Sequence, residues 1–122
     1  MSWDIWVESP PCEHCGRPAS AGELRNYTHN CNEMLRRSLA AVGRLDELGD
    51  RQLYALDGLP CARAAEMLAP ALEWWSRSRE ALMRLNPENG WGDEASAFAF
   101  WRWVLNQCRS NPLATLMVRV SG

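Results

Sequence analysis

Two cysteines near the N-terminus have the spacing of a metal knuckle. Cys12 and Cys15 enclose two residues and are followed by Gly16, an arrangement in which two thiolates can chelate Zn²⁺ from one tight turn. A structural zinc needs four ligands, and the nearest further candidates are His29 and Cys31. The sequence therefore suggests a structural zinc held by these four side chains. The competing interpretation is a pair of free thiols in a polar turn.

The residues around Cys12 and Cys15 favour a metal site over a redox motif. His14 lies between the two cysteines and is a substitute for one of the other ligands. Redox CxxC motifs place their first cysteine at a helix N-terminus, where the helix dipole lowers the thiol pKa. Here prolines precede Cys12, and Gly16 and Pro18 follow the motif, so a redox role is less favoured than a metal site.

A second candidate site lies in residues 26–30, where short hydrogen-bonding side chains alternate with larger ones. If this segment is extended, Asn26, Thr28 and Asn30 share one face, as a pocket for a polar ligand requires. The competing interpretation is turn and capping chemistry. Asn30 followed three residues later by Glu33 resembles a capping box with Asn30 in the capping position.

One tryptophan of the seven in the chain stands in an unusual setting. Trp91 lies between Gly90 and Gly92, so the backbone can swing a large ring over a bound base or sugar, and stacking on a base contributes roughly 1–3 kcal/mol. The alternative is a lid that folds back over the protein's own core. If the ligand carries phosphate, an arginine such as Arg102 or Arg109 is suited to meet it.

Composition excludes several classes of function. All 13 basic residues are arginine, so Schiff-base lysines and phosphate-loop lysines are absent. The net charge of −2 provides no basic excess for binding duplex nucleic acid. Both histidines lie near the N-terminal knuckle, no serine has the sequence context of a nucleophile elbow, and the acidic residues fall mostly on solvated helix faces. The sequence therefore favours a binding protein over an enzyme and assigns no catalytic residue.

Hydrophobic periodicity and turn residues define the elements that must position these side chains. Pro70 falls inside the longest helical pattern and predicts a kink or a break there. Asp93 is the expected cap of the last helix, whose near-continuous apolar surface makes it the central one. In chain order we expect a strand over 3–7, a loop over 12–22, an extended segment over 24–29, a helix over 31–42, a connection with a helical turn over 44–59, a helix over 60–85, a turn over 86–92, a helix over 94–109 and a strand over 116–121.

These elements predict one α+β domain over residues 1–122, mostly helical. The N- and C-terminal strands should form a small antiparallel sheet on which three helical segments pack. No apolar run approaches the roughly 20 residues of a membrane span, and the N-terminus carries an acid where a signal peptide is basic. We therefore expect a cytoplasmic protein with no membrane partner, whose five cysteines are thiols or metal ligands and not disulfides.

Three stretches together resemble a family of small uncharacterised proteins encoded by bacteriophages and prophages, many of them in actinobacterial hosts. They are the Asn-Tyr-Thr-His-Asn element at 26–30, the Asn-Pro-Glu-Asn-Gly-Trp-Gly-Asp turn at 86–93 and the Val-Arg-Val-Ser ending at 118–121, in a chain that opens with Trp-Asp-Ile-Trp at 3–6. The resemblance spans most of the chain. It implies the cytoplasm of the host cell as the place of action.

That resemblance bears on the sites but carries over no function. Family members keep the Asn-x-Thr-x-Asn element and the Asn-Gly-Trp-Gly turn. They vary at the positions of His29 and Cys31, which weakens the four-ligand zinc model and makes Cys12 and Cys15 a variable addition. By analogy with small phage proteins that act by binding, we expect an anti-defence role.

Three hypotheses follow. The first is a non-enzymatic protein that sequesters a nucleotide-derived host-defence signal, with Asn26, Thr28, Asn30 and Trp91 lining the pocket and an arginine on the phosphate. The second is a protein-interaction module that blocks a host factor through exposed Trp and Arg anchors. The third is a small zinc-stabilised enzyme or nucleic-acid accessory. The sequence leaves open whether the protein is a homo-oligomer.

Overall fold

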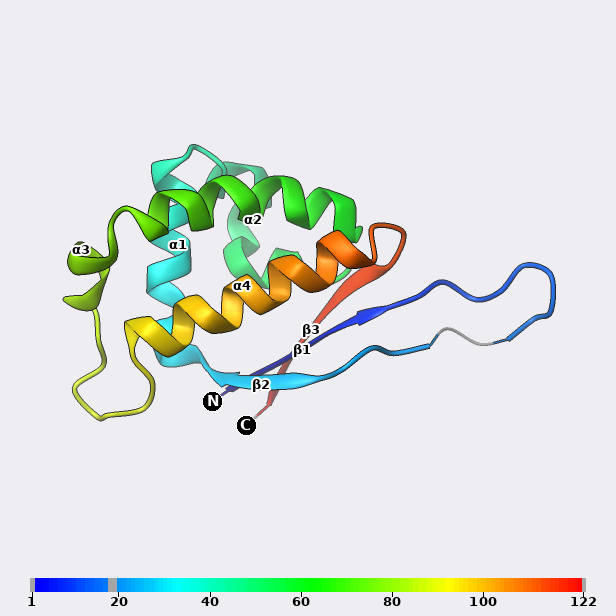
Figure 1. Ribbon diagram of the computed structural model, residues 1–122, viewed down its shortest axis with the longest axis horizontal. Helices are drawn as coiled ribbons and strands as arrows, with labels where there is room; N and C mark the ends of the chain where they lie inside the picture. Colours follow the sequence, from blue (N-terminus) through cyan, green and yellow to red (C-terminus); the bar gives the residue numbers. More distant parts are fainter. Residues whose placement is uncertain (1, 18–19, 122) are drawn as a thin grey trace.

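The computed structural model describes residues 2–17 and 20–121, so Met1, Pro18, Ala19 and Gly122 lie outside the described residues. As predicted, the fold is α+β, with helices packed on a small antiparallel sheet that contains the two terminal strands (Figure 1). The elements are β1 (Ser2–Glu8), β2 (Arg25–Thr28), the 3-10 helix η1 (His29–Cys31), α1 (Asn32–Ala41), the 3-10 segment η2 (Leu45–Leu56), α2 (Cys61–Ser76), α3 (Arg79–Met83), α4 (Glu94–Ser110) and β3 (Thr115–Ser121).

The sheet has the order β2-β1-β3, with antiparallel pairing on both sides of β1. Strand β1 takes the central place because alternate side chains, those of Trp3, Ile5 and Val7, are apolar and buried. Ser2 pairs with both Thr28 and Ser121, so the two ends of the described chain lie side by side at the same end of the sheet. The sequence predicted the β1–β3 pair, and β2 adds the third strand.

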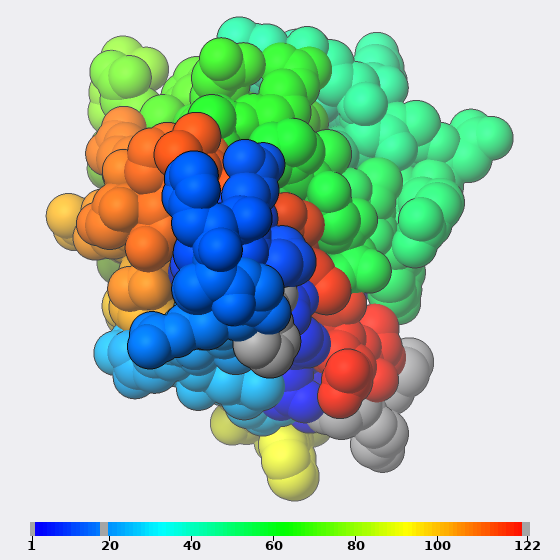
Figure 2. Space-filling view, turned by 90° about the vertical axis from the view of Figure 1, so that its right-hand side faces the viewer, coloured from blue at the N-terminus to red at the C-terminus, as the bar shows by residue number. Residues whose placement is uncertain are grey.

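The connection between β1 and β2 is a long hairpin that extends past the helices (Figure 1). Its arms stay paired beyond the strands, through the Glu8–Ala21 bridge and a hydrogen bond of 2.8 Å from the Ser9 N–H to the Ser20 carbonyl. Figure 2 views the molecule from the side of the hairpin tip, and residues of the tip lie in front of the sheet there. The Cys12–Cys15 knuckle therefore lies at the end of an arm, away from the helical body.

Helix α4 is the central helix of the fold, as its apolar surface predicted. Phe98, Trp101, Val104 and Leu105 are buried on it, and it lies between the sheet and α2 (Figure 1). Asp93 caps it as expected: its carboxylate accepts the Ser96 N–H at 2.8 Å. None of the helices in the described part of the chain is long and apolar enough to cross a membrane.

Two local predictions need correction. Of the kink or break predicted at Pro70, the break does not occur: α2 continues through Pro70 from Cys61 to Ser76, and the helix ends only before α3. Asn30 is not a cap either. A turn of 3-10 helix precedes α1, and Thr28 caps that turn by accepting the Asn30 N–H at 3.3 Å. Glu33 does not reach back to close a capping box because Arg36 engages its carboxylate.

Candidate functional site

Four residues singled out from the sequence line one cleft of about 670 Å³. We call it the asparagine cleft. It lies where the end of β2 and the start of η1 meet the turn before α4. Its lining residues are Ser2, Asn26, Tyr27, Thr28, His29, Asn30, Asn89 and Trp91. The structure therefore brings Asn26, Thr28, Asn30 and Trp91 together from segments some sixty residues apart in the sequence.

Strand β2 presents Asn26 and Thr28 on the sheet face that points away from the helices. Tyr27, between them, points the other way and stacks on Phe100 of α4, with ring centroids 5.1 Å apart. The Asn26 amide nitrogen donates to Ser2 Oγ at 2.9 Å and to Asp4 Oδ1 at 2.7 Å. These bonds fix the amide, so its oxygen remains as the acceptor for a ligand.

The turn that carries Trp91 is built by side-chain hydrogen bonds to the backbone. Asn89 Oδ1 accepts the Trp91 N–H at 2.9 Å, which leaves the Asn89 amide nitrogen as a donor. Gly90 and Gly92 have φ values of +76° and +93°, in the left-handed region that favours glycine. The Trp91 side chain is 69% exposed. It is therefore no lid over the core, and of the two interpretations only the exposed ring remains.

Close packing fixes this turn against β2 and η1. A Cβ atom on Gly92 would lie 2.7 Å from Thr28 Cγ2 and 2.9 Å from Cys31 Sγ. The Tyr27 hydroxyl lies 2.6 Å from Ser96 Oγ and donates to the Asp93 carbonyl at 3.2 Å. Burial raises the pKa of both the Tyr27 hydroxyl and the Cys31 thiol, so both groups are neutral structural parts at neutral pH.

The two predicted phosphate ligands lie elsewhere. Arg102 and Arg109 line a groove of about 750 Å³ between α2 and α4, which we call the arginine groove. Among the described residues neither forms an ion pair, whereas Arg79 in the same groove pairs with the buried carboxylate of Glu94. The full lining is Ala69, Pro70, Leu72, Glu73, Ser76, Arg79, Phe98, Arg102, Leu105, Asn106 and Arg109. No residue lines both clefts.

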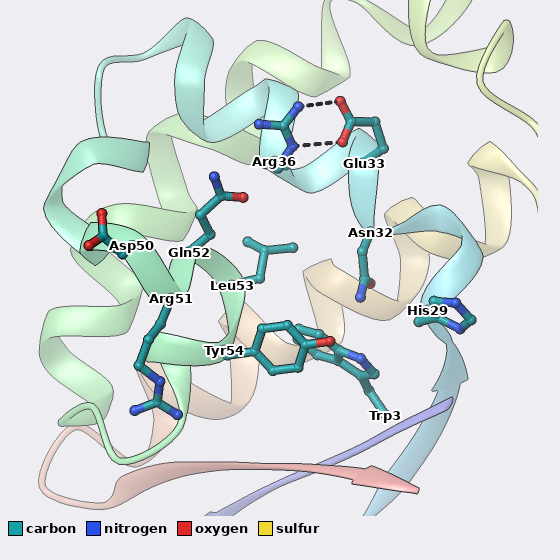
Figure 3. Close-up of a pocket in the computed structure, with 10 residues that line it drawn as sticks. All are labelled: Trp3, His29, Asn32, Glu33, Arg36, Asp50, Arg51, Gln52, Leu53 and Tyr54. Atoms are coloured by element: carbon teal, nitrogen blue, oxygen red, sulfur yellow. Dashed lines mark hydrogen bonds and ion pairs between the residues drawn. The ribbon is translucent and has the colours of Figure 1, made fainter. Parts of the chain in front are cut away.

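A third hollow, of about 640 Å³, was not expected from the sequence (Figure 3). It lies between α1 and η2, and Arg36 and Glu33 form two hydrogen bonds of 2.7 Å at its upper rim.

Gln52, which lines this hollow, has φ +51° and ψ −126°, a conformation that costs a non-glycine residue roughly 1–3 kcal/mol. The buried Trp3 N–H has no hydrogen-bond partner in the described residues. Nothing in the sequence around Gln52 signals that backbone conformation.

The Cys12–Cys15 pair forms a well-defined knuckle. The Cys15 N–H donates to Cys12 Sγ at 3.4 Å, the Gly16 N–H donates to the Cys12 carbonyl at 3.0 Å, and Gly16 has φ +68°. Hydrogen bonding, first from the Cys15 thiol and then from its backbone N–H, holds the pKa of the Cys12 thiol below its ordinary value. This arrangement is suited to a thiolate and to a metal ion.

The other two predicted metal ligands do not lie with this pair. His29 and Cys31 follow the opposite end of β2, and Ser2 to Glu8 alone spans about 20 Å at the usual rise of a strand. Zinc–ligand distances are about 2.0–2.3 Å, so one zinc cannot bind all four side chains of the same chain. Within residues 2–17 and 20–121, no group of three or more His, Cys, Asp or Glu side chains is placed to hold a metal ion.

Comparison with known proteins provides no relative for this arrangement. The chain matches no family model, no curated protein and no solved structure.

Proposed function

We propose that the protein is a non-enzymatic binding protein that holds a nucleotide-derived ligand by its base in the asparagine cleft. One observation carries the proposal: Trp91 is 69% exposed and lines a cleft whose other side chains are hydrogen-bonding groups. An exposed indole ring offers a flat apolar face on which a planar group can stack, and its position beside hydrogen-bonding side chains suits a ligand that is both planar and polar. A planar base stacked on the indole would cover it and would contribute roughly 1–3 kcal/mol.

The polar groups of the cleft match the edge of a base. The Asn26 oxygen accepts, the Asn89 nitrogen donates, and the Asn30 amide forms no side-chain hydrogen bond among the described residues and is able to do both. No Asp, Glu, Lys or Arg side chain lines the cleft. Recognition would therefore read the base, and any phosphate would extend toward solvent instead of reaching Arg102 or Arg109.

The biological use we propose is sequestration of a nucleotide signal of host defence, following the resemblance to phage proteins described above. A protein that sequesters a signal in this way needs to bind it tightly and stoichiometrically, without converting it. The ligand should be recovered chemically unchanged after release by denaturation. Mass spectrometry of the released molecule, after prolonged incubation with the protein, measures this directly, and conversion of the ligand would contradict sequestration.

The binding test is a panel of nucleosides, linear nucleotides and cyclic mono- and dinucleotides, screened by thermal shift and followed by calorimetry. Trp91→Ala should weaken binding of the selected ligand about 5- to 150-fold, the loss of one stacking contact. Trp91→Phe should retain part of the affinity, and Asn30→Ala should weaken binding with little change in stability. Leu113→Ala is the matched control, because Leu113 is 88% exposed and lies outside the cleft.

Two results would contradict the proposal. One is the absence of a shift with every member of the panel. The other is a ligand that binds Trp91→Ala as tightly as the wild type but is lost in the Arg102→Ala/Arg109→Ala double variant, which would place the nucleotide in the arginine groove.

A second function, a protein-interaction module that blocks a host factor, is favoured by the arginine groove itself. Arg102 and Arg109 lie seven residues apart on one helix, about 10 Å along its axis, with Phe98 and Leu105 as apolar neighbours. An acidic amphipathic helix is the kind of partner that this spacing suits. Capture of a host protein by the wild type but not by Arg102→Ala/Arg109→Ala would support it, and equal capture by both would count against it.

A further inference from the structure

The Cys12–Cys15 knuckle has the features of half a metal site. Its backbone is already in the conformation that a chelating turn requires, with the Cys15 N–H on Cys12 Sγ at 3.4 Å and the chain reversing at Gly16. Cys15 is exposed and Cys12 is half-buried, so neither residue of the pair is buried in the core. Pro10 and Pro11, which have fixed φ and no N–H, precede the turn and stiffen its approach.

The rest of the described chain does not supply the other half. His29 and Cys31 lie at the far end of β2, and Cys31 is buried under the Trp91 turn. Cys61 and Cys108 are buried in the core. The described residues contain no third metal-binding side chain placed beside the pair. A structural zinc with four ligands therefore needs two more thiolates from outside the molecule.

We propose that two copies of this chain share one zinc ion through their hairpin tips, each copy providing Cys12 and Cys15. The tip is at the end of an arm that extends past the helices (Figure 1), and it is the part nearest the viewer when the molecule is seen from the hairpin side (Figure 2). Two arms can therefore meet tip to tip without contact between the helical bodies. A twofold axis through the metal would place the same two sulfur atoms on each side, the self-complementary arrangement of a symmetric dimer.

The charges at the tip permit this approach. Glu13 and Arg17 carry opposite charges within the knuckle, so each tip is near neutral before its thiols ionise. Two thiols ionise on each copy as zinc binds, and four protons are released to solvent for each ion bound. The tetrahedral geometry and the distance of about 2.3 Å from zinc to sulfur are those of an ordinary four-cysteine site. This site is independent of the asparagine cleft.

The experiment uses the full chain, kept reduced with a phosphine reductant and stripped of metal. Zinc is added from zero to one equivalent, and mass is followed by light scattering and native mass spectrometry. The expected product is a species of twice the 13.8 kDa of one chain, with one zinc for two chains. It should form fully at half an equivalent and revert with EDTA. Cobalt(II) in place of zinc should give tetrahedral visible bands and thiolate charge-transfer absorption that saturate at the same half equivalent.

Cys15→Ser and Cys12→Ala should each abolish the zinc-dependent doubling of mass while circular dichroism and the melting temperature stay near wild type, because the tip lies outside the core. His29→Ala is the control, since the shared site does not use His29. A zinc-free double variant, Cys12→Ala/Cys15→Ser, mixed with wild type should not enter the zinc-bound dimer.

Any of four outcomes would overturn the proposal. They are one zinc bound per monomer, loss of zinc in His29→Ala, a dimer that persists in EDTA with reductant present, and no change of mass at one equivalent of zinc.

Discussion

The contact between the Trp91 turn and the β2–η1 segment can be tested with one added methyl group. Gly92 has φ +93°, where an L-residue is strained by roughly 1–2 kcal/mol. In Gly92→Ala the new Cβ would also lie 2.7 Å from Thr28 Cγ2, 2.9 Å from Cys31 Sγ and 3.0 Å from the Tyr27 hydroxyl. These distances are shorter than any ordinary carbon contact. Forcing a methyl group into packed surroundings costs about 1–3 kcal/mol.

Gly90 provides the matched control two residues earlier in the same turn. Its φ of +76° is strained for alanine in the same way, but a Cβ there meets no atom within 4 Å. Both substitutions reduce the entropy of the unfolded chain by a similar amount, worth about 0.4–1 kcal/mol. We therefore expect Gly92→Ala to lower the free energy of unfolding by about 2–4 kcal/mol and Gly90→Ala by about 1 kcal/mol or less.

Urea denaturation of the two variants and the wild type measures this difference. With the slope m unchanged, the midpoint should fall further for Gly92→Ala than for Gly90→Ala, by the cost of the methyl contacts alone. Equal midpoints for the two variants would refute the reasoning, since they would mean that the turn is not packed against β2 and η1. The asparagine cleft would then lack a fixed wall on the Trp91 side.

Three further predictions concern stability. Gln52→Gly should raise the free energy of unfolding by about 1 kcal/mol or more, because φ +51° with ψ −126° suits only glycine; a lower midpoint in urea would contradict this. Glu94→Ala should destabilise the protein far more than Glu94→Gln. The buried Trp75 N–H donates to the Glu94 carboxylate at 2.7 Å, and alanine would leave it without an acceptor, at a cost of about 1–3 kcal/mol. Similar melting temperatures for the two variants would contradict this. Burial raises the pKa of the Cys108 thiol above its ordinary 9.0, so this thiol loses its proton at a lower pH in the unfolded chain than in the folded protein. The contribution of the protonated Cys108 thiol to the free energy of unfolding is full below about pH 9 and falls as the pH rises, by about 1.4 kcal/mol at pH 10. Cys108→Ala should flatten that part of the pH profile measured by urea denaturation.

The fold was readable from the sequence where the signal is local. Period-two alternation of Trp3, Ile5 and Val7 sets the buried face of β1, and the spacing of apolar residues from Phe98 to Cys108 sets that of α4. Both patterns act within one element and need no knowledge of its neighbours. The same holds for the Asp93 cap, whose hydrogen bonds join residues three apart.

Tertiary packing decided the positions where local rules failed. Pro70 removes one backbone hydrogen bond and clashes with the preceding turn, at a cost of about 3 kcal/mol. Burial of Leu68, Ala71 and Leu72 on either side of it, at about 1.5–3 kcal/mol for each large side chain, outweighs that cost and keeps α2 continuous. The prediction of an Asn30 cap was wrong because the structure begins the helical segment earlier, at His29. Thr28 was already in place on β2 to cap the chain two residues earlier.

The candidate site also depends on contacts between elements, which the sequence of one element does not reveal. The helical spacing of Arg102, Asn106 and Arg109, at i, i+4 and i+7, puts them on one face of α4, and the structure places all three in one groove. Periodicity cannot say what lies opposite that face, because this depends on how α2 packs beside α4. The Asn26–Asn30 element and the Trp91 turn were each visible in the sequence, but their meeting depends on the close approach at Gly92.

The separation of the two clefts changes what kind of ligand is consistent with the protein. A pocket with an arginine on the phosphate would bind any nucleotide mainly through its charge, and the affinity would fall steeply with salt. The asparagine cleft has no Asp, Glu, Lys or Arg among its lining residues, so the affinity for the ligand that we propose would depend on stacking over Trp91 and on hydrogen bonds along the edge of the base. The stacking would accept any base, and the pattern of hydrogen-bond donors and acceptors would discriminate between bases. A protein built in this way would distinguish one base from another among ligands that carry the same phosphates.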